Sequence, residues 1–152
     1  MTDCIATRRW PRHLLVLVAA WLLATAWGSV VQTQFNLQAL VALGVTVPPG
    51  LRALTTLRDL VGFGPVYAGI LAAGWLPALG LAAWLARRWP GARTALYTIA
   101  AGVGMVVAVR AVDALAPMPV FIDATRGWPG LLSMAAGAAL GGWLYVRHRG
   151  RL

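Results

Sequence analysis

Apolar residues fall into four long runs along the chain, separated by short polar or basic segments. The runs cover residues 14–31, 64–86, 94–115 and 129–146, and none is shorter than 18 residues. A helix of about 18 to 20 apolar residues is long enough to cross a hydrocarbon core roughly 30 Å thick. The pattern therefore predicts an all-α integral membrane protein, in which four transmembrane helices form one bundle and a single domain over residues 1–152.

Residues 32–63 do not follow this pattern and are predicted to lie outside the membrane core or at its surface. They begin with five uncharged polar residues, Gln32, Thr33, Gln34, Asn36 and Gln38. The apolar stretch 39–47 is too short to cross, and the two prolines at 48 and 49 break any helix that reaches them. Residues 51–63 have the periodicity of an amphipathic helix. Polar side chains recur at positions 52, 55, 56 and 59, and the positions between them are mostly leucine. We expect short amphipathic or re-entrant helices here, between the first and second spans.

Charge determines the predicted orientation. The chain is 60% hydrophobic and 11% charged; all 13 basic residues are arginines, and there is no lysine or glutamate. Nine arginines (8, 9, 12, 87, 88, 93, 147, 149 and 151) flank one side of the predicted spans, and four (52, 58, 110 and 126) flank the other. Because arginine is enriched on the cytoplasmic side of membrane proteins, both termini are predicted to be cytoplasmic, with residues 32–63 and 116–127 outside.

The same composition indicates the kind of organism and the kind of binding partner. A bias towards Arg, Ala and Gly is typical of a GC-rich bacterial genome, so we expect a multi-pass protein of the bacterial inner membrane. The net charge of +9 is explained by topology and anionic lipid head groups, and no nucleic-acid partner is expected.

The first run has a second interpretation. A basic start, an apolar stretch over residues 14–23 and the triplet Ala24-Thr25-Ala26 also resemble a secretory signal with its cleavage site. We favour a retained helix, because the apolar run continues to Val31 and Trp27 is bulky for the position after a cut.

The candidate binding residues are the charged and amide side chains on the predicted outer side. Arg110 and Asp113 lie three residues apart at the end of the third run, as do Asp123 and Arg126 in the loop that follows it. The simplest interpretation is that these pairs neutralise each other near lipid. The alternative is a pocket for an anion, a lipid head group or another ligand, formed by Gln34, Gln38, Arg52, Arg58, Asp59, Arg110, Asp113, Asp123 and Arg126.

Small residues at four-residue spacing predict where helices pack closely. The third run carries Ala100, Gly104 and Ala108, and the fourth carries Ser133, Gly137 and Gly141. Such ridges let two backbones approach in a membrane. Whether the ridge of the fourth helix packs within the bundle or against another subunit is left open by the sequence.

The sequence offers few residues that could catalyse a reaction or bind a metal. His13 and His148 both flank spans, Cys4 is the only cysteine, and no histidine or glutamate lies within a span. We therefore expect no catalytic residues, no metal and no cofactor. The leading hypothesis is a non-enzymatic accessory or assembly module that binds membrane lipids or a partner membrane protein. The alternatives are a small oligomeric transporter or channel and, third, a lipid-modifying membrane enzyme; a homo-oligomer is possible in each case.

Overall fold

The computed structural model describes residues 3–115 and 122–149 and shows an all-helical chain. The long helices are α1 (Asp3–Ala42), α3 (Gly64–Arg88), α4 (Arg93–Leu115) and α5 (Trp128–Arg149). A shorter helix, α2 (Pro49–Gly62), precedes α3, and two 3₁₀ turns, η1 (Pro90–Ala92) and η2 (Asp123–Arg126), precede α4 and α5. No strand occurs within the described ranges.

Four helices are long and apolar enough to cross a membrane, which confirms the number read from the apolar runs. The candidate spans are Arg12–Ala42, Gly64–Arg88, Pro90–Leu115 and Trp128–Arg149. The first apolar turn of α3 follows Phe63 directly, and Pro65 occupies the first turn of that helix, where its missing N–H costs no hydrogen bond. The prediction of an all-α protein with four membrane-length helices is correct.

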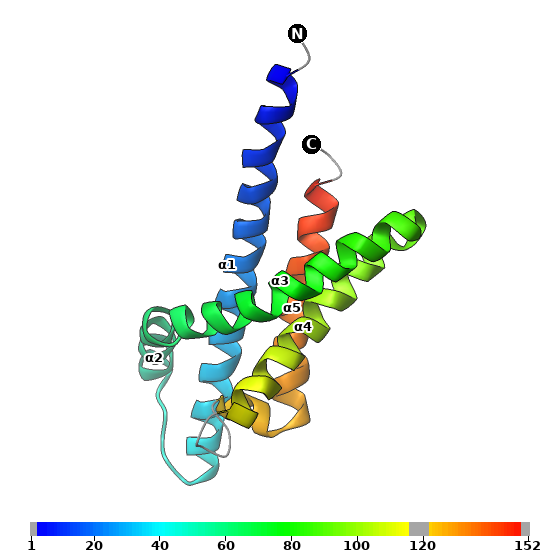
Figure 1. Cartoon of the computed structure of the whole chain (residues 1–152). Helices are drawn as coiled ribbons and strands as arrows, with labels where there is room; N and C mark the ends of the chain where they lie inside the picture. Colours follow the sequence, from blue (N-terminus) through cyan, green and yellow to red (C-terminus); the bar gives the residue numbers. More distant parts are fainter. Residues whose placement is uncertain (1–2, 116–121, 150–152) are drawn as a thin grey trace.

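The helices pack in the order α1, α5, α4, α3, and α3 also contacts α1, which closes the bundle. Helix α5 lies against α1 on one side and α4 on the other, and α3 forms an antiparallel hairpin with α4. Figure 1 shows the α3–α4 hairpin crossing the other two helices obliquely, with α2 beside the start of α3. The start of α1, the η1 turn and the end of α5 lie at one end of the bundle, called here the η1 end, and η2 lies at the opposite end, called here the α2 end.

Glycines allow the closest helix contacts. A side chain at Gly74 of α3 would overlap the carbonyl oxygen of Gly104 on α4 and lie 2.8 Å from the Cβ of Ala108. The two backbones therefore touch directly, without side chains between them, and the ridge of the third apolar run faces α3.

The ridge of the fourth apolar run faces α1, within the bundle. The indole of Trp27 covers Gly137 and donates a hydrogen bond from Nε1 to the carbonyl oxygen of Ser133, at 2.9 Å. A side chain at Gly141 would meet the indole of Trp75 at 2.8 Å and the carbonyl oxygen of Ala20 at 3.0 Å.

The expected end of the first helix was wrong. Helix α1 continues through Gln32–Gln38 to Ala42, and the chain leaves the helix at Gly44, whose φ of +88° is the one positive value among the described residues. Glutamine and threonine do not break a helix when their side chains find partners, and here α2 and η2 supply them. Only one separate helix, α2, lies between the first two spans, where more than one short helix was expected.

Part of the predicted outer loop lies outside the described residues. These are residues 116–121, so the loop 116–127 is described only from Ile122 onward. The side chains of Arg8, Arg9 and Arg151, which contribute to the arginine count, are not described either.

Candidate functional site

The polar face of α2 is turned inward onto α1. Arg52 donates from Nη1 to Gln34 Oε1 at 2.8 Å, and Gln34 donates from Nε2 to Thr56 Oγ1 at 3.1 Å. One turn away, Thr33 donates to Asp59 Oδ2 at 2.8 Å, and Thr33 itself is fully buried. These side chains, Thr33, Gln34, Arg52, Thr56 and Asp59, are called here the polar cluster; together they fix α2 against the end of α1.

The opposite face of α2 is exposed and mostly apolar, with Arg58 as its one charged residue. Among residues 49–62 none is buried, and the exposed fractions are 48% for Leu51, 45% for Leu54, 62% for Leu57 and 79% for Val61. In water, an amphipathic helix presents its polar face to solvent and buries its apolar face. The reversed orientation of α2 is the arrangement expected of a helix surrounded by lipid or by another apolar surface.

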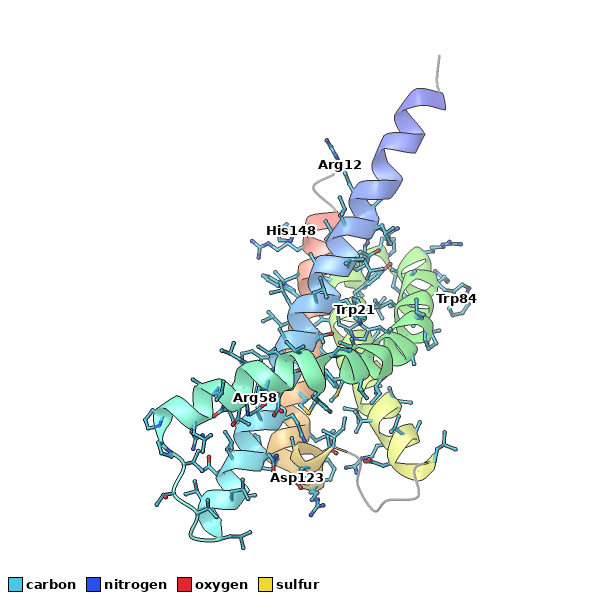
Figure 2. All side chains as sticks on the ribbon, turned by 90° about the vertical axis from the view of Figure 1, so that its left-hand side faces the viewer. Arg12, Trp21, Arg58, Trp84, Asp123 and His148 are labelled. Atoms are coloured by element: carbon cyan, nitrogen blue, oxygen red, sulfur yellow. The ribbon has the colours of Figure 1, made fainter. Side chains whose placement is uncertain are left out.

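Helix α1 also holds the 3₁₀ turn η2. Gln32 Oε1 accepts a hydrogen bond of 2.8 Å from the backbone N–H of Ala124, and the buried Thr125 hydroxyl donates to the carbonyl oxygen of Ile122 at 2.7 Å. Asp123 and Arg126 form an ion pair at 2.8 Å on the outer surface of this turn, with side chains 32% and 66% exposed. Figure 2 shows Asp123 at the α2 end of the molecule, far from Arg12 and His148 at the η1 end.

The pair Arg110 and Asp113 forms within α4 but is loose. The shortest distance is 3.9 Å, from Nη1 to Oδ2, with Arg110 52% exposed and Asp113 only 11% exposed. A partly exposed pair at this distance contributes little to stability, on the order of 0–1 kcal/mol.

The predicted binding residues therefore do not form one site. Three of them, Gln34, Arg52 and Asp59, come together in the polar cluster, and two pairs, Asp123–Arg126 and Arg110–Asp113, stand on other elements. The remaining two, Gln38 and Arg58, are exposed.

Several buried hydroxyl groups were missed by the sequence analysis. Thr25, Ser29 and Thr33 follow one another at four-residue spacing on α1, and all three are buried. The hydroxyl oxygens of Thr25, Ser29 and, on α3, Tyr67 have no hydrogen-bond partner among the described residues. The ring of Tyr67 lies against Gly28. The four-residue spacing was the signal available in the sequence, but it could not show that α3 covers these groups.

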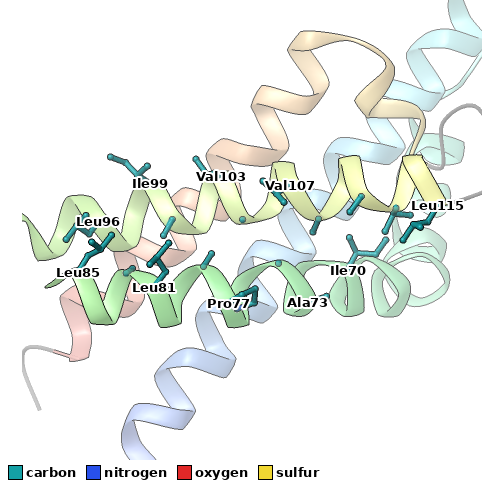
Figure 3. A pocket seen from close by; sticks show the side chains of 18 residues that line it. Ile70, Ala73, Pro77, Leu81, Leu85, Leu96, Ile99, Val103, Val107 and Leu115 are labelled. Atoms are coloured by element: carbon teal, nitrogen blue, oxygen red, sulfur yellow. The ribbon is translucent and has the colours of Figure 1, made fainter. Parts of the chain in front are cut away.

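A long apolar groove runs between α3 and α4. Its volume is about 730 Å³, and it extends from Ile70 to Leu85 on α3 and from Leu96 to Leu115 on α4. Figure 3 shows the side chains of both helices along this groove, among them Pro77 and Val103. All of its lining residues are apolar, and Val103, Val107 and Ile99 are between 54% and 62% exposed.

No protein-family model, curated protein or solved structure matches the chain. Among the described residues there is also no group of three His, Cys, Asp or Glu side chains placed to hold a metal ion. The geometry of the helices is thus the basis for any functional assignment.

Proposed function

We propose that the chain is a non-enzymatic assembly module of the bacterial inner membrane, with both termini in the cytoplasm, that holds a transmembrane helix of a partner protein in the α3–α4 groove. The observation that carries this proposal is the groove itself: it is continuous, apolar and exposed over nearly the whole length of α4.

The length of the groove favours a helix over a lipid chain. From Leu96 to Leu115 the groove follows α4 over 19 residue-to-residue steps, which corresponds to about 28 Å at 1.5 Å per step. One acyl chain reaches only through its own leaflet, about 15 Å, which is half of the hydrocarbon core. A transmembrane helix of the partner spans both leaflets and fills the groove along its full length.

One polar group in the groove and one arginine beside it also suit a protein partner. Proline has no N–H, so Pro77 leaves the carbonyl oxygen of Ala73 without its usual helical donor, and both residues line the groove. A serine or threonine hydroxyl on the partner would supply that hydrogen bond. At the α2 end, Arg110 lies on the same face of α4 as Val103, because Val103 precedes it by seven residues, which is about two helical turns. Because Arg110 is half exposed and only loosely paired, it can bind an acidic group on the partner.

The orientation of α2 supports its placement in the membrane. Its leucines face outward while Arg52, Thr56 and Asp59 are hydrogen-bonded to α1, so the polar cluster needs no water on the lipid side; the exposed Arg58 is long enough to extend its guanidinium to the lipid head groups. In our proposal α2 lies in the outer leaflet and widens the apolar surface next to the start of α3.

A photo-crosslinking amino acid in the groove tests the assembly proposal. We would place it at Val103 and, as a matched control, at Leu132 on α5, which is 59% exposed on another face. In intact membranes we expect Val103 to give one discrete protein adduct whose crosslinked peptide is a transmembrane segment, and Leu132 to give none. Arg110→Gln should reduce the yield of the adduct. Equal adducts from both positions, lipid adducts alone, or an adduct of twice the mass of this chain would refute the proposal, the last in favour of a homo-oligomer.

A small transporter is the second candidate, because of the buried hydroxyl groups between α1 and α3. Thr25, Ser29 and Tyr67 form a polar strip that leads towards Asp59 through Thr33. Towards the η1 end, this strip gives way to Ala24 and Ala20, which belong to the apolar core. Proton or cation flux into liposomes that is abolished by Asp59→Asn would favour a transporter over the assembly module.

A further inference from the structure

A second groove opens at the η1 end, where α1 and α3 diverge. It has a volume of about 390 Å³ and is lined by α1 residues such as Trp21 and by α3 residues such as Trp75 and Leu76. Tyr97 of α4 and Tyr145 and Arg149 of α5 complete its lining, so all four long helices contribute. Except for Arg149 and the tyrosine hydroxyl and indole N–H groups, the walls are apolar.

Arg149 is held in place by the two tyrosines. Its Nη1 atom donates hydrogen bonds to the hydroxyl oxygens of Tyr97, at 3.1 Å, and Tyr145, at 3.2 Å, and its guanidinium carbon lies 5.8 Å from the centre of the Tyr145 ring. A guanidinium has five N–H donors, and these two bonds use both hydrogens of Nη1. The donors on Nη2 and Nε make no hydrogen bond within the described part of the chain.

The remaining donors form a site for an anion. Nη2 and Nε together present the planar pair of N–H groups that binds two oxygens of a phosphate or carboxylate at once. Each tyrosine accepts a hydrogen bond from Arg149, which leaves its own O–H hydrogen available to donate to the same anion. The arginine is already ordered before the anion binds, so less side-chain entropy is lost on binding.

The groove beside this site has the length of one lipid leaflet. On α3 it extends from Ala72 to Ala83, which is about 16 Å along the helix, against about 15 Å for half of a hydrocarbon core. The long α3–α4 groove differs in both respects, since it crosses both leaflets and lacks an arginine among its lining residues.

We propose that this second groove binds one anionic phospholipid, with an acyl chain between Trp21 and Trp75 and the phosphate on Arg149, Tyr97 and Tyr145. An anionic lipid is favoured over a zwitterionic one because Arg12 and the two arginines in the last turn of α3, Arg87 and Arg88, lie at the same end of the bundle and add positive potential there. The site is independent of the partner groove, so either proposal can fail without the other.

Native mass spectrometry of the detergent-solubilised protein tests the lipid site. We would add dioleoylphosphatidylglycerol or dioleoylphosphatidylcholine at equal concentrations and measure the lipid-bound fraction. We expect one phosphatidylglycerol to bind selectively, and Arg149→Gln to weaken its binding about ten-fold, the equivalent of one charge-assisted hydrogen bond. Arg147→Gln removes the same charge two residues away, where the guanidinium lies 4.8 Å from the Trp143 ring, and should leave binding nearly unchanged.

A pair of glycine substitutions tests the groove rather than the charge. Gly80 lines this groove, and a Cβ placed there meets no atom within 4 Å, so the side chain of Gly80→Leu has room to extend into the groove and fill it. Gly69 is equally open but does not line the groove, which makes Gly69→Leu the matched control. We expect Gly80→Leu to abolish selective binding and Gly69→Leu to retain it.

Three outcomes would overturn the lipid site. They are equal binding of the two lipids to the parent protein, equal loss of binding in Arg149→Gln and Arg147→Gln, and full binding by Gly80→Leu. The thermal unfolding midpoint of each variant without added lipid identifies a variant that has lost its fold. If Arg149→Gln has lost its fold, Arg149→Lys is measured in its place. Lysine keeps the positive charge but lacks the planar pair of N–H groups, so this variant should still bind phosphatidylglycerol more weakly than the parent.

Discussion

The contact between Gly74 and Gly104 predicts opposite effects for the same substitution at two positions of α3. In Gly74→Ala, the new Cβ would overlap the carbonyl oxygen of Gly104 and lie 2.8 Å from the Cβ of Ala108. The overlapping atom belongs to a helix backbone and cannot rotate away, so α3 and α4 must separate. Gly69→Ala, five residues earlier, places its Cβ where no atom lies within 4 Å.

The magnitudes follow from packing and helix propensity. Overpacking of a tight contact costs about 1–3 kcal/mol, whereas replacing glycine by alanine inside a helix gains about 1 kcal/mol. We therefore expect Gly74→Ala to destabilise the protein by up to about 2 kcal/mol and Gly69→Ala to stabilise it by up to about 1 kcal/mol. For a chain of this size, a net difference of about 1–3 kcal/mol between the two variants corresponds to roughly 2–12 °C in the unfolding midpoint.

Thermal unfolding in a mild detergent, followed by circular dichroism, measures both variants under the same conditions. Position 80 is also open, so Gly80→Ala should behave like Gly69→Ala. This variant shows whether the gain in stability is general to open positions of α3. If Gly74→Ala melts at or above the temperature of Gly69→Ala, the two backbones do not touch and the described packing of α3 on α4 is wrong.

Three further predictions concern the charged groups and the topology. In a double-mutant cycle on thermal stability, Arg110→Ala and Asp113→Ala should couple by less than about 1 kcal/mol, because the pair is long and half exposed; a larger coupling would show that the pair closes in the membrane. Asp59→Ala should destabilise the protein by about 0.5–1.5 kcal/mol, because it removes the hydrogen bond from Thr33 to α2 while the Thr33 hydroxyl keeps a second acceptor, the carbonyl oxygen of Ser29 at 2.9 Å. It should also make α2 more susceptible to limited proteolysis than in the parent; unchanged proteolysis would mean that the polar cluster does not hold α2. A reporter inserted at Gly50 should behave as exported and one fused after the last residue as cytoplasmic, so a cytoplasmic signal at Gly50 would contradict the proposed orientation.

The four long helices were predictable because their signal is local. A run of 18 or more apolar residues needs no information from the rest of the chain to be recognised as a membrane-length helix. The amphipathic pattern of α2 was predictable for the same reason. The end of α1 was not, because glutamine is a good helix former and the polar residues do not mark a helix end. The partners that cover Gln32, Thr33 and Gln34 lie 92, 26 and 22 residues away in the sequence.

The two grooves could not be derived from the sequence. The walls of the long groove depend on the close contact of α3 with α4 at Gly74 and Gly104. Those of the second groove depend on how α3 lies against α1, through contacts such as Gly28 with the ring of Tyr67 and Trp21 with the carbonyl oxygen of Ala68. Arg149 and Tyr145 are four residues apart, and that spacing was visible. Tyr97 lies 52 residues before Arg149, and no periodicity connects the two.

The hydrogen bonds between α1 and its partners also affect how the chain folds during its synthesis. Asp59 follows Thr33 by 26 residues, and Ala124 follows Gln32 by 92 residues. At a synthesis rate of about 5–20 residues per second, Asp59 is made about 1–5 s after Thr33, and Ala124 about 5–18 s after Gln32. During this interval the polar side chains at the end of α1 must be hydrated. The nascent helix therefore has to keep this end in water until α2 and then η2 are synthesised.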